Sequence, residues 1–285
     1  MLFEISSAFS STMFKGEFLQ LNSPYLVFFK LSDYEDKEKY VHILNLKTNQ
    51  TDSLWSIEAK VLNDALYYCD KNSIKKRTLS QSSCNNDSII IKTQFDIENF
   101  YIGDSDIVVA EIDSSYAKVN IMYYIDDKCQ FRKSVPCHPE EMEWQISKIY
   151  SFEDYFVISV QYDLYVFDKS QKTLNKFVEG CPEFSMDQAG NIYYTQNSED
   201  FLVKKLYVSN IKDLNSKREI IKDSGSIEIL SYIVNNNNKS YSLINNKLYE
   251  LFNQTLQPIP NIKFSESNGY DIIINQEEGN FSINY

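Results

Sequence analysis

Few side chains in this sequence could act together as nucleophile and base. The chain contains two histidines, His42 and His138, and five cysteines. His138 directly follows Cys137, which places a thiol beside a base. Adjacent side chains point apart in an extended chain, so we expect a plain loop here rather than a catalytic pair. His42 stands between Val41 and Ile43, where we predict a strand with the imidazole on its outward face.

Carboxylates are plentiful and gather in two polar segments. These segments hold Asp33, Glu35, Asp36 and Glu38, and Glu140, Glu141 and Glu143. Glycosidase chemistry needs two acids at a defined separation in a cleft, whereas charge runs between strands usually face solvent. The sequence also lacks a calcium-binding loop, an H-E-x-x-H motif and a glycine-rich phosphate loop. We therefore expect no catalytic residues, no metal site and no cofactor.

Cysteine usage and hydropathy indicate a compartment. Five cysteines without a C-x-x-C pair favour reduced thiols over a disulfide framework or a zinc site. The first residues lack the basic and apolar regions of a signal peptide, and no stretch is apolar enough to span a membrane. We expect a cytoplasmic or nuclear protein with no membrane partner.

The formal net charge of −12 argues against a nucleic-acid partner, because an acidic surface repels phosphates. The densest basic stretch, Lys75 to Arg77, is short and predicted to lie on the solvated face of a strand. We expect no direct nucleic-acid binding. The chain also has 21 Tyr and 18 Phe but only 7 Gly and 6 Pro, so Asn, Asp and Ser must form many turns between aromatic-rich strands.

A repeat organises these strands. The pair Leu-Tyr recurs at 42-residue steps, and one step earlier stands Met-Tyr. The four pairs begin at Met122, Leu164, Leu206 and Leu248. Each starts a short run with alternating apolar side chains, which is typical of a strand, and other strand-like runs flank it. Four strands in about 42 residues is the pattern of one propeller blade. We predict that the three leucines occupy equivalent positions in successive blades.

The same unit recurs with looser spacing toward both ends. The sequence therefore predicts an all-β fold, a single β-propeller domain of about seven four-stranded blades over 1–285. The predicted blades are 11–57, 58–95, 96–137, 138–181, 182–224, 225–260 and 261–285 plus 2–9. Six blades remain an alternative count. A β-sandwich would also have short strands, but its strands have no reason to recur in groups of four.

The last unit has no residues left for an outer strand. The N-terminus offers an alternating run, Leu2 to Phe9, that no other unit uses. An open ring would expose unpaired strand edges, which soluble proteins avoid. We predict that Leu2 to Phe9 closes the ring as the outer strand of the last blade.

Two segments resemble WD40 repeats. Val41 to Gln50 (VHILNLKTNQ) and Leu164 to Lys172 (LYVFDKSQK) look like the third strand of such a repeat and its following turn. The usual Trp-Asp ending is replaced by Leu44-Asn45 and by Phe167-Asp168. The resemblance implies a propeller that binds other proteins, but the hydrogen-bonded tetrad of WD40 repeats cannot be assigned because its Gly-His and Trp-Asp dipeptides are absent.

Acidic, aromatic-bearing loops are the candidate contact surface, since propellers bind partners through the loops around their rim. These loops are Ser32 to Lys39, Ser114 to Lys118, Cys137 to Trp144 and Ser198 to Lys205. The predicted partner-binding residues are Asp33, Tyr34, Glu35, Asp36, His138, Glu141 and Trp144. Tyr34 and Trp144 are the expected anchors, because aromatic residues concentrate interface energy. Packing within a blade is an equal alternative for Trp144.

The leading hypothesis is a non-catalytic WD40-like scaffold or adaptor inside an intracellular multiprotein complex. It rests on fold-level analogy and on the lack of a recognisable catalytic site. A subunit of an RNA-protein particle, such as a ribosome-associated or ribosome-biogenesis factor, is the first alternative. A propeller hydrolase is the second, and it would require converging carboxylates in a deep channel.

Overall fold

The fold is known from a computed structural model of the chain. The structure describes residues 11–14, 16–22, 24–30, 40–79, 87–137, 148–181, 184–197, 204–222, 229–232, 240–244, 247–252, 254–259, 261–265, 271–275 and 281–284. All regular elements in these ranges are β-strands.

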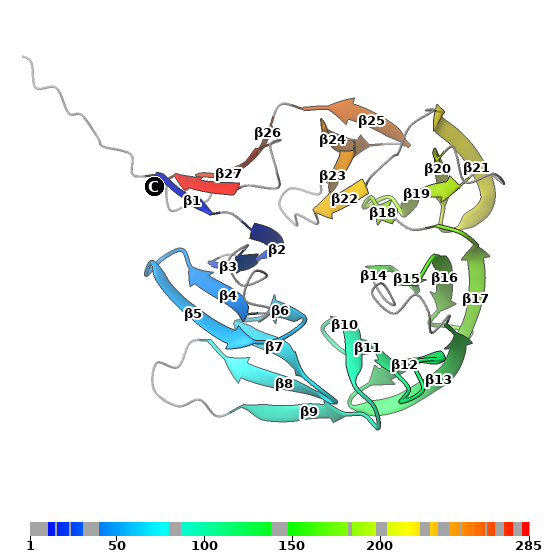
Figure 1. Ribbon diagram of the computed structural model, residues 1–285, viewed down its shortest axis with the longest axis horizontal. Coiled ribbons are helices and arrows are strands. Elements are labelled where there is room, and N and C mark those ends of the chain that lie inside the picture. The colour runs from blue at the N-terminus through cyan, green and yellow to red at the C-terminus, as the bar shows by residue number, and fades with distance from the viewer. Residues whose placement is uncertain are drawn as a thin grey trace, which may run out of the picture.

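The strands form seven four-stranded antiparallel sheets, which are arranged as blades around a common centre (Figure 1). The first three sheets contain β2 (Gly16–Asn22), β3 (Tyr25–Lys30), β4 (Tyr40–Asn45) and β5 (Gln50–Trp55); β6 (Ala59–Leu62), β7 (Ala65–Asp70), β8 (Ser73–Thr78) and β9 (Ser88–Lys92); and β10 (Ile97–Ile102), β11 (Asp106–Ile112), β12 (Lys118–Ile125) and β13 (Lys128–Pro136).

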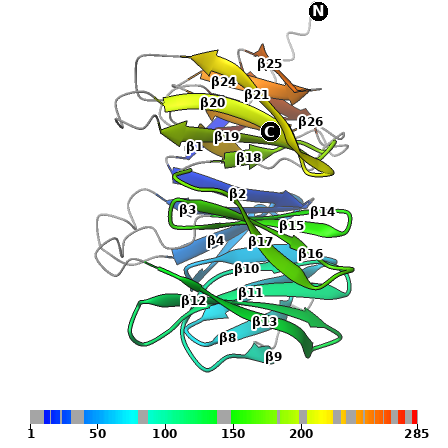
Figure 2. The ribbon, with the colours of Figure 1, turned by 90° about the vertical axis from the view of Figure 1, so that its right-hand side faces the viewer.

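The next three sheets contain β14 (Ile149–Phe152), β15 (Tyr155–Val160), β16 (Asp163–Asp168) and β17 (Thr173–Val178); β18 (Phe184–Met186), β19 (Asn191–Asn197), β20 (Lys204–Asn210) and β21 (Asp213–Lys222); and β22 (Ile229–Tyr232), β23 (Ser240–Ile244), β24 (Lys247–Phe252) and β25 (Thr255–Pro258). The seventh contains β26 (Asn261–Ser265), β27 (Asp271–Asn275), β28 (Phe281–Asn284) and β1 (Ser11–Phe14). Figure 2 shows the outer strands β13, β17 and β21 crossing the side of the molecule.

Asn and Asp form many of the tight turns, as the composition predicts. Asn63 and Asp64 join β6 to β7, and Asp126 and Asp127 join β12 to β13, all with positive φ. These two residue types tolerate the left-handed region better than other non-glycine residues. Gly180 and Gly190 are the only glycines with positive φ among the described residues. The chain therefore turns sharply with little help from glycine.

The core consists of apolar layers between consecutive blades. In β11, Val108 and Ala110 pack into the layer shared with the fourth blade, whereas Ile107 and Val109 pack into the layer shared with the second. Successive side chains of a strand point to opposite faces, and here both faces are covered. This double burial explains why the inner strands are continuous apolar runs instead of alternating polar and apolar residues.

The predicted equivalence of the three leucines is confirmed. Leu164, Leu206 and Leu248 all lie near the start of the third strand of successive sheets, in β16, β20 and β24. Met122 also lies in a third strand, β12, but its side chain packs toward the preceding blade, whereas Leu164 packs toward the following one. The fourth point of the repeat is therefore out of register, and Tyr123 of β12 faces the layer that its spacing assigned to Met122.

The prediction for His42 is wrong. Its side chain is buried in β4 and stacks on Phe28 of β3, with ring centroids 5.4 Å apart. Val41 and Ile43 pack into the layer shared with the second blade, and His42, on the other face of β4, is only 8% exposed. Both faces of β4 are therefore covered, and alternation along this strand does not move a side chain into solvent.

The N-terminal strand completes the last blade, but the segment differs from the predicted one. β1 is hydrogen-bonded to β28, with Ser11 opposite Asn284 and Phe14 opposite Phe281, and it is the outermost strand of that sheet. The predicted strand, Leu2 to Phe9, lies outside the described residues, and the predicted first blade wrongly included β1. The N-terminus thus supplies the outer strand of the last sheet, as predicted, through β1.

We predict that deleting residues 1–14 lowers the thermal midpoint of the whole domain and promotes aggregation, because it removes β1 and exposes the edge of β28. Losing a few kcal/mol shifts a domain of this size by roughly 5–10 °C. Differential scanning calorimetry measures the effect, with deletion of residues 1–10 as the matched control. An equal fall after the shorter deletion would assign closure to the segment that precedes β1.

Candidate interaction surface

The connections between strands divide over two faces of the disc. Turns joining second to third strands, and the crossovers from one sheet to the next, lie at one end of every sheet. Turns joining first to second and third to fourth strands lie at the other end, because antiparallel neighbours alternate in direction. We call the first end the crossover face and the second the opposite face.

A repeated backbone hydrogen bond fixes the crossover face in three consecutive blades. A residue of the crossover that follows the outer strand donates its N–H to a carbonyl of the turn between the second and third strands. Thr93 donates to Asn72 at 2.9 Å, Cys137 donates to Ala117 at 2.8 Å, and Cys181 donates to Tyr162. Each crossover is thereby attached to the neighbouring turn, which satisfies two backbone groups that would otherwise lack partners.

Exposed aromatic side chains gather on this face. The large apolar side chains exposed in the described part of the chain are Trp55 (45%), Ile89 (58%), Tyr116 (43%) and Tyr162 (39%). Tyr116 and Tyr162 lie in the second-to-third-strand turns of adjacent blades, and Trp55 ends the outer strand β5. Three of the four thus belong to the crossover face, whereas scattered exposure would show no such preference.

The predicted partner-binding residues lie outside the described residues. Asp33, Tyr34, Glu35 and Asp36 fall between β3 and β4, and His138, Glu141 and Trp144 fall between β13 and β14. The strand ends that flank both segments belong to the crossover face. The same holds for the loop Ser198 to Lys205, which connects β19 to β20.

The sequence analysis included Tyr116 within a candidate loop but missed Tyr162. Tyr162 occupies a two-residue turn with Gln161, between two regular strands, and Gln161 has a φ of 52°. A turn that short looks like strand continuation in an apolar sequence. The one feature of the sequence that could have identified Tyr162 is an aromatic residue at a turn, where few other side chains are available for packing.

Cys69 and Cys137 are not activated nucleophiles. Burial raises the pKa of the Cys137 thiol to about 11, and burial together with the nearby Glu58, Asp70, Glu98 and Asp96 carboxylates raises that of Cys69 to about 12. A reactive thiol needs the opposite shift. Within the described ranges, no group of three or more Cys, His, Asp or Glu side chains could hold a metal ion, and no helix could cross a membrane.

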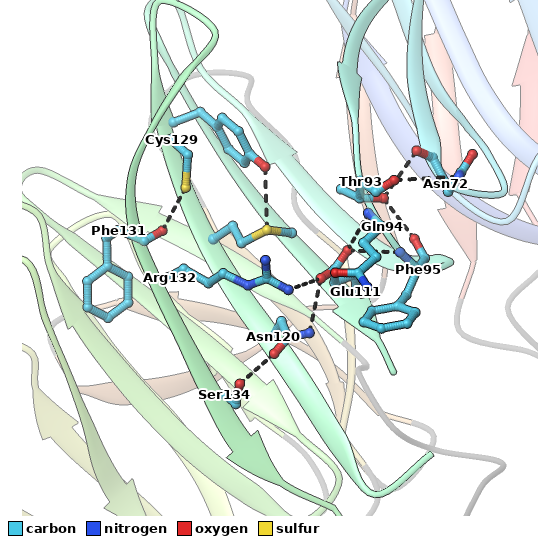
Figure 3. A network of polar contacts seen from close by, with 12 residues as sticks. Asn72, Thr93, Gln94, Phe95, Glu111, Asn120, Cys129, Phe131, Arg132 and Ser134 are labelled. Carbon is cyan, nitrogen blue, oxygen red and sulfur yellow. Dashed lines mark hydrogen bonds and ion pairs between the residues drawn. The ribbon is translucent and has the colours of Figure 1, made fainter. Parts of the chain in front are cut away.

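A buried carboxylate holds the crossover between the second and third blades (Figure 3). Glu111 of β11 is fully buried and accepts hydrogen bonds from the backbone N–H groups of Gln94 and Phe95 at 3.1 and 3.2 Å. Its other oxygen accepts from Asn120 at 3.0 Å and from Arg132 at 2.8 Å. With four donors around it, Glu111 is a structural group that positions the crossover.

The basic stretch in β8 is half-buried and largely paired, so its prediction as a solvated face is wrong. Arg77 binds both carboxylate oxygens of Asp87 at 2.8 and 3.0 Å and reaches Asp52 of the first blade at 3.2 Å. Lys75 pairs with Asp70 at 2.5 Å, and Lys76 lies over the Tyr67 ring. The Arg77–Asp52 pair joins the first two blades, and the other contacts hold the basic side chains within the second blade.

Asp187 performs a similar structural role in the fifth blade. It is buried and accepts hydrogen bonds from the Asn191 backbone N–H and side chain, both at 2.9 Å, and from the Tyr193 hydroxyl at 3.0 Å. Gln254 of the sixth blade donates to Asn191 at 3.3 Å. The network fixes the β18–β19 turn and links it to the next blade.

Comparisons with solved structures agree with this architecture. The WD40 β-propeller domain of Doa1 is 13% identical, with 98% of this chain and 95% of that chain covered and a TM-score of 0.52. The N-terminal domain of Nup159 is 8% identical, with 95% and 89% covered and a TM-score of 0.53. The β-propeller domain of the Trilobed protease from Pyrococcus furiosus is 14% identical, with 92% and 90% covered and a TM-score of 0.54.

These likenesses establish the fold and not a function. No protein-family model matches the sequence, and no curated protein matches it. The similar structures include propellers that belong to proteases and propellers that do not, so they leave enzymatic activity open. The chain has the all-β, WD40-like propeller fold that the sequence predicts.

We predict that replacing Glu111 lowers the free energy of unfolding of the domain, because this carboxylate has a structural role. Glu111→Ala leaves the Gln94 and Phe95 N–H groups and Asn120 without their acceptor, which should cost about 3–5 kcal/mol. Urea denaturation followed by circular dichroism measures the loss. Asp127→Asn, in an exposed turn, is the matched control and should change the free energy of unfolding by less than about 0.5 kcal/mol.

Asp87 should make stability depend on pH. Its hydrogen bonds from Arg77, opposed by burial and assisted by Tyr68, hold the pKa of the carboxyl below its usual value. A depressed pKa in the folded state gives stabilisation that is present above the unfolded pKa and is lost as the pH falls through the folded one. Asp87→Asn should therefore cost about 1–2 kcal/mol at pH 7 and progressively less below about pH 4. Urea denaturation of the original chain and the variant, at pH 7 and below about pH 4, tests this. A loss of stability that is the same at both would contradict it.

Proposed function

We propose that this protein is a non-catalytic scaffold or adaptor that binds other proteins through its crossover face. The observation that carries the proposal is that Trp55, Tyr116 and Tyr162, three of the four large apolar side chains exposed in the described part of the chain, lie on one face of the disc. Aromatic residues supply much of the energy of protein interfaces at a small cost in conformational entropy. An aromatic side chain on a turn that hydrogen bonds hold in place is suited to that role.

The architecture supports the same proposal. The polar networks around Glu111, Arg77 and Asp187 connect turns and blades, and their groups are satisfied by one another, as in a structural framework. Two similar structures are the WD40 domain of Doa1 and the N-terminal domain of Nup159, and a solved assembly contains Dbp5 bound to Nup159. Protein binding by this chain remains a proposal that such relationships favour by analogy.

We propose an intracellular setting for the complex, in keeping with a sequence that has five cysteines and no C-x-x-C pair. Cys69, Cys129 and Cys137 are not in disulfides, and Cys129 is exposed. Proteins of oxidising compartments usually pair their cysteines. We place the complex in the cytoplasm or the nucleus.

Site-specific photo-crosslinking tests the proposed face. With p-benzoylphenylalanine in place of Tyr116 or Tyr162, irradiation in an extract of the source cells should join the chain to discrete protein partners, identified by mass spectrometry. The same photoreactive residue at Asp127, on the opposite face, is the matched control. Adducts from Asp127 alone, or none from either tyrosine position, would contradict the proposal.

Substitutions measure the contribution of the predicted residues. Tyr116→Ala combined with Tyr162→Ala should lower the affinity for the cross-linked partner by roughly tenfold or more, as expected for interface aromatics. The thermal midpoint should not fall, because both residues are exposed. Joint replacement of Tyr34, Asp33, Glu35 and Asp36 should also lower this affinity. Ile89→Ala, an exposed apolar residue on the rim of the second blade, serves as the control and should leave binding unchanged.

A further inference from the structure

The outer strand of the second blade, β9, lacks the protection that other outer strands carry. An edge strand presents unpaired N–H and C=O groups, which proteins usually shield with charged residues or proline. Among the described outer strands of five or more residues, β5, β13, β17 and β21 carry charges at interior positions, such as Asp52, Arg132, Lys176 and Arg218. The interior of β9 is Ile89 to Ile91. In the described part of the chain β8 is its one neighbour, and its other edge lies at the rim (Figure 1).

A β-bulge in this strand turns Ile89 outward. Ile91 lies opposite Ile74 and Ile89 lies opposite Lys75, so Ile90 is an extra residue in β9. Ile90 and Ile91 both pack into the layer shared with the third blade, and Ile91 is only 4% exposed. Ile89 faces the other way and is 58% exposed, the highest value among the described large apolar side chains. Bulges often re-aim a side chain in this manner, and here the side chain is one that gains free energy when it is covered.

The surroundings of β9 are close to neutral, although the chain has a formal net charge of −12. Two copies of a chain with that charge repel each other. Together with their ion-pair partners, β8 and β9 hold four basic and three acidic residues: Lys75, Lys76, Arg77 and Lys92, and Asp52, Asp70 and Asp87. A second copy can therefore approach this edge without the repulsion that the net charge produces elsewhere.

The edge of β9 is also suited to pair with itself. In an antiparallel pair related by a two-fold axis, one residue of each copy stands opposite its own equivalent. With Ile89 at that position, residues 87–91 of both copies lie side by side and the two exposed isoleucines cover each other. Lys92 of each copy then lies beyond the paired stretch, at opposite ends of it, so these two charges do not meet.

We propose that a second copy of this chain pairs with the edge of β9, in an antiparallel arrangement centred on Ile89. A contact of five residues per copy is smaller than the roughly 20–30 residues per side of a standard interface, so the dimer is weak and depends on concentration. Because the paired strands run in opposite directions, the crossover faces of the two copies point opposite ways. The dimer does not depend on the proposed function, but it offers that interaction face twice.

Sedimentation velocity of the full chain tests the inference. Between about 1 µM and about 200 µM, the range of weak affinities, the monomer should give way to a discrete dimer. Ile89→Lys places two like charges opposite each other and should weaken the dimer about tenfold or more. Its thermal midpoint should not fall, because Ile89 is exposed. Tyr162→Lys makes the same change at an exposed residue of the crossover face and should leave the dimer constant within about twofold.

Disulfide trapping tests the register of the pair. In a chain with Cys84→Ser and Cys129→Ser, Ile89→Cys should give a covalent dimer on mild oxidation, because opposed residues of antiparallel strands have Cα atoms about 4.5–5.5 Å apart. A reductant should release the monomer. Lys92→Cys in the same chain is the matched control: six residues separate the two equivalent positions along the pair, or about 20 Å, so no such dimer should form.

Each remaining outcome decides against the inference. A chain that stays monomeric over the whole range, or a dimer that Ile89→Lys leaves intact, would overturn it. Equal losses from Ile89→Lys and Tyr162→Lys would move self-association to the crossover face. Oligomers that keep growing with concentration would indicate a head-to-tail contact in place of the two-fold pair. Photo-crosslinking from Tyr116 and Tyr162 tests the proposed function separately, and its failure would leave the dimer standing.

Discussion

The packing of each blade against two neighbours is the constraint on which the rest of this structure depends. The second to fifth sheets pack against a neighbour on both faces, so a strand such as β11 sends alternate side chains into two different apolar layers. The hydrophobic effect then stabilises blades only as a set, since no blade buries its own faces alone. A buried charge is consequently tolerated only where hydrogen-bond partners surround it.

That restriction explains where polar chemistry occurs. Buried carboxylates survive only where a turn or crossover offers several donors, as for Glu111 and Asp187. Both groups are used to fix connections, which leaves the exposed parts of those connections free to vary. The aromatic side chains of Tyr116 and Tyr162 are carried by turns that backbone hydrogen bonds hold in place. A rigid support for a variable surface is the usual basis for binding on this kind of scaffold.

Much of the fold could be predicted from the sequence because the repeat consists of apolar side chains at a regular spacing. The spacing of Leu164, Leu206 and Leu248 identified the third strands, since each must enter the same kind of layer. The errors have one physical origin. The alternation of side chains along a strand shows that neighbours face opposite sides of the sheet, but it does not show what covers each side. His42 was therefore placed on an outward face, and Met122 was counted in one register with the leucines although Tyr123 is the residue that faces the corresponding layer. Tyr162 was missed because a two-residue turn leaves almost no break in an apolar pattern.

The pairing of β1 with β28 has a consequence for how the molecule is made. The two strands are separated by nearly the whole sequence, so the entropy of closing this loop must be overcome before the last sheet is complete. A chain that emerges from the ribosome N-terminus first carries β1 without its partner while all intervening blades are synthesised. The ring can form only after translation has passed β28, so co-translational folding yields an open arc of blades. During that interval the exposed edges of the arc are the part of the molecule that chaperones would protect.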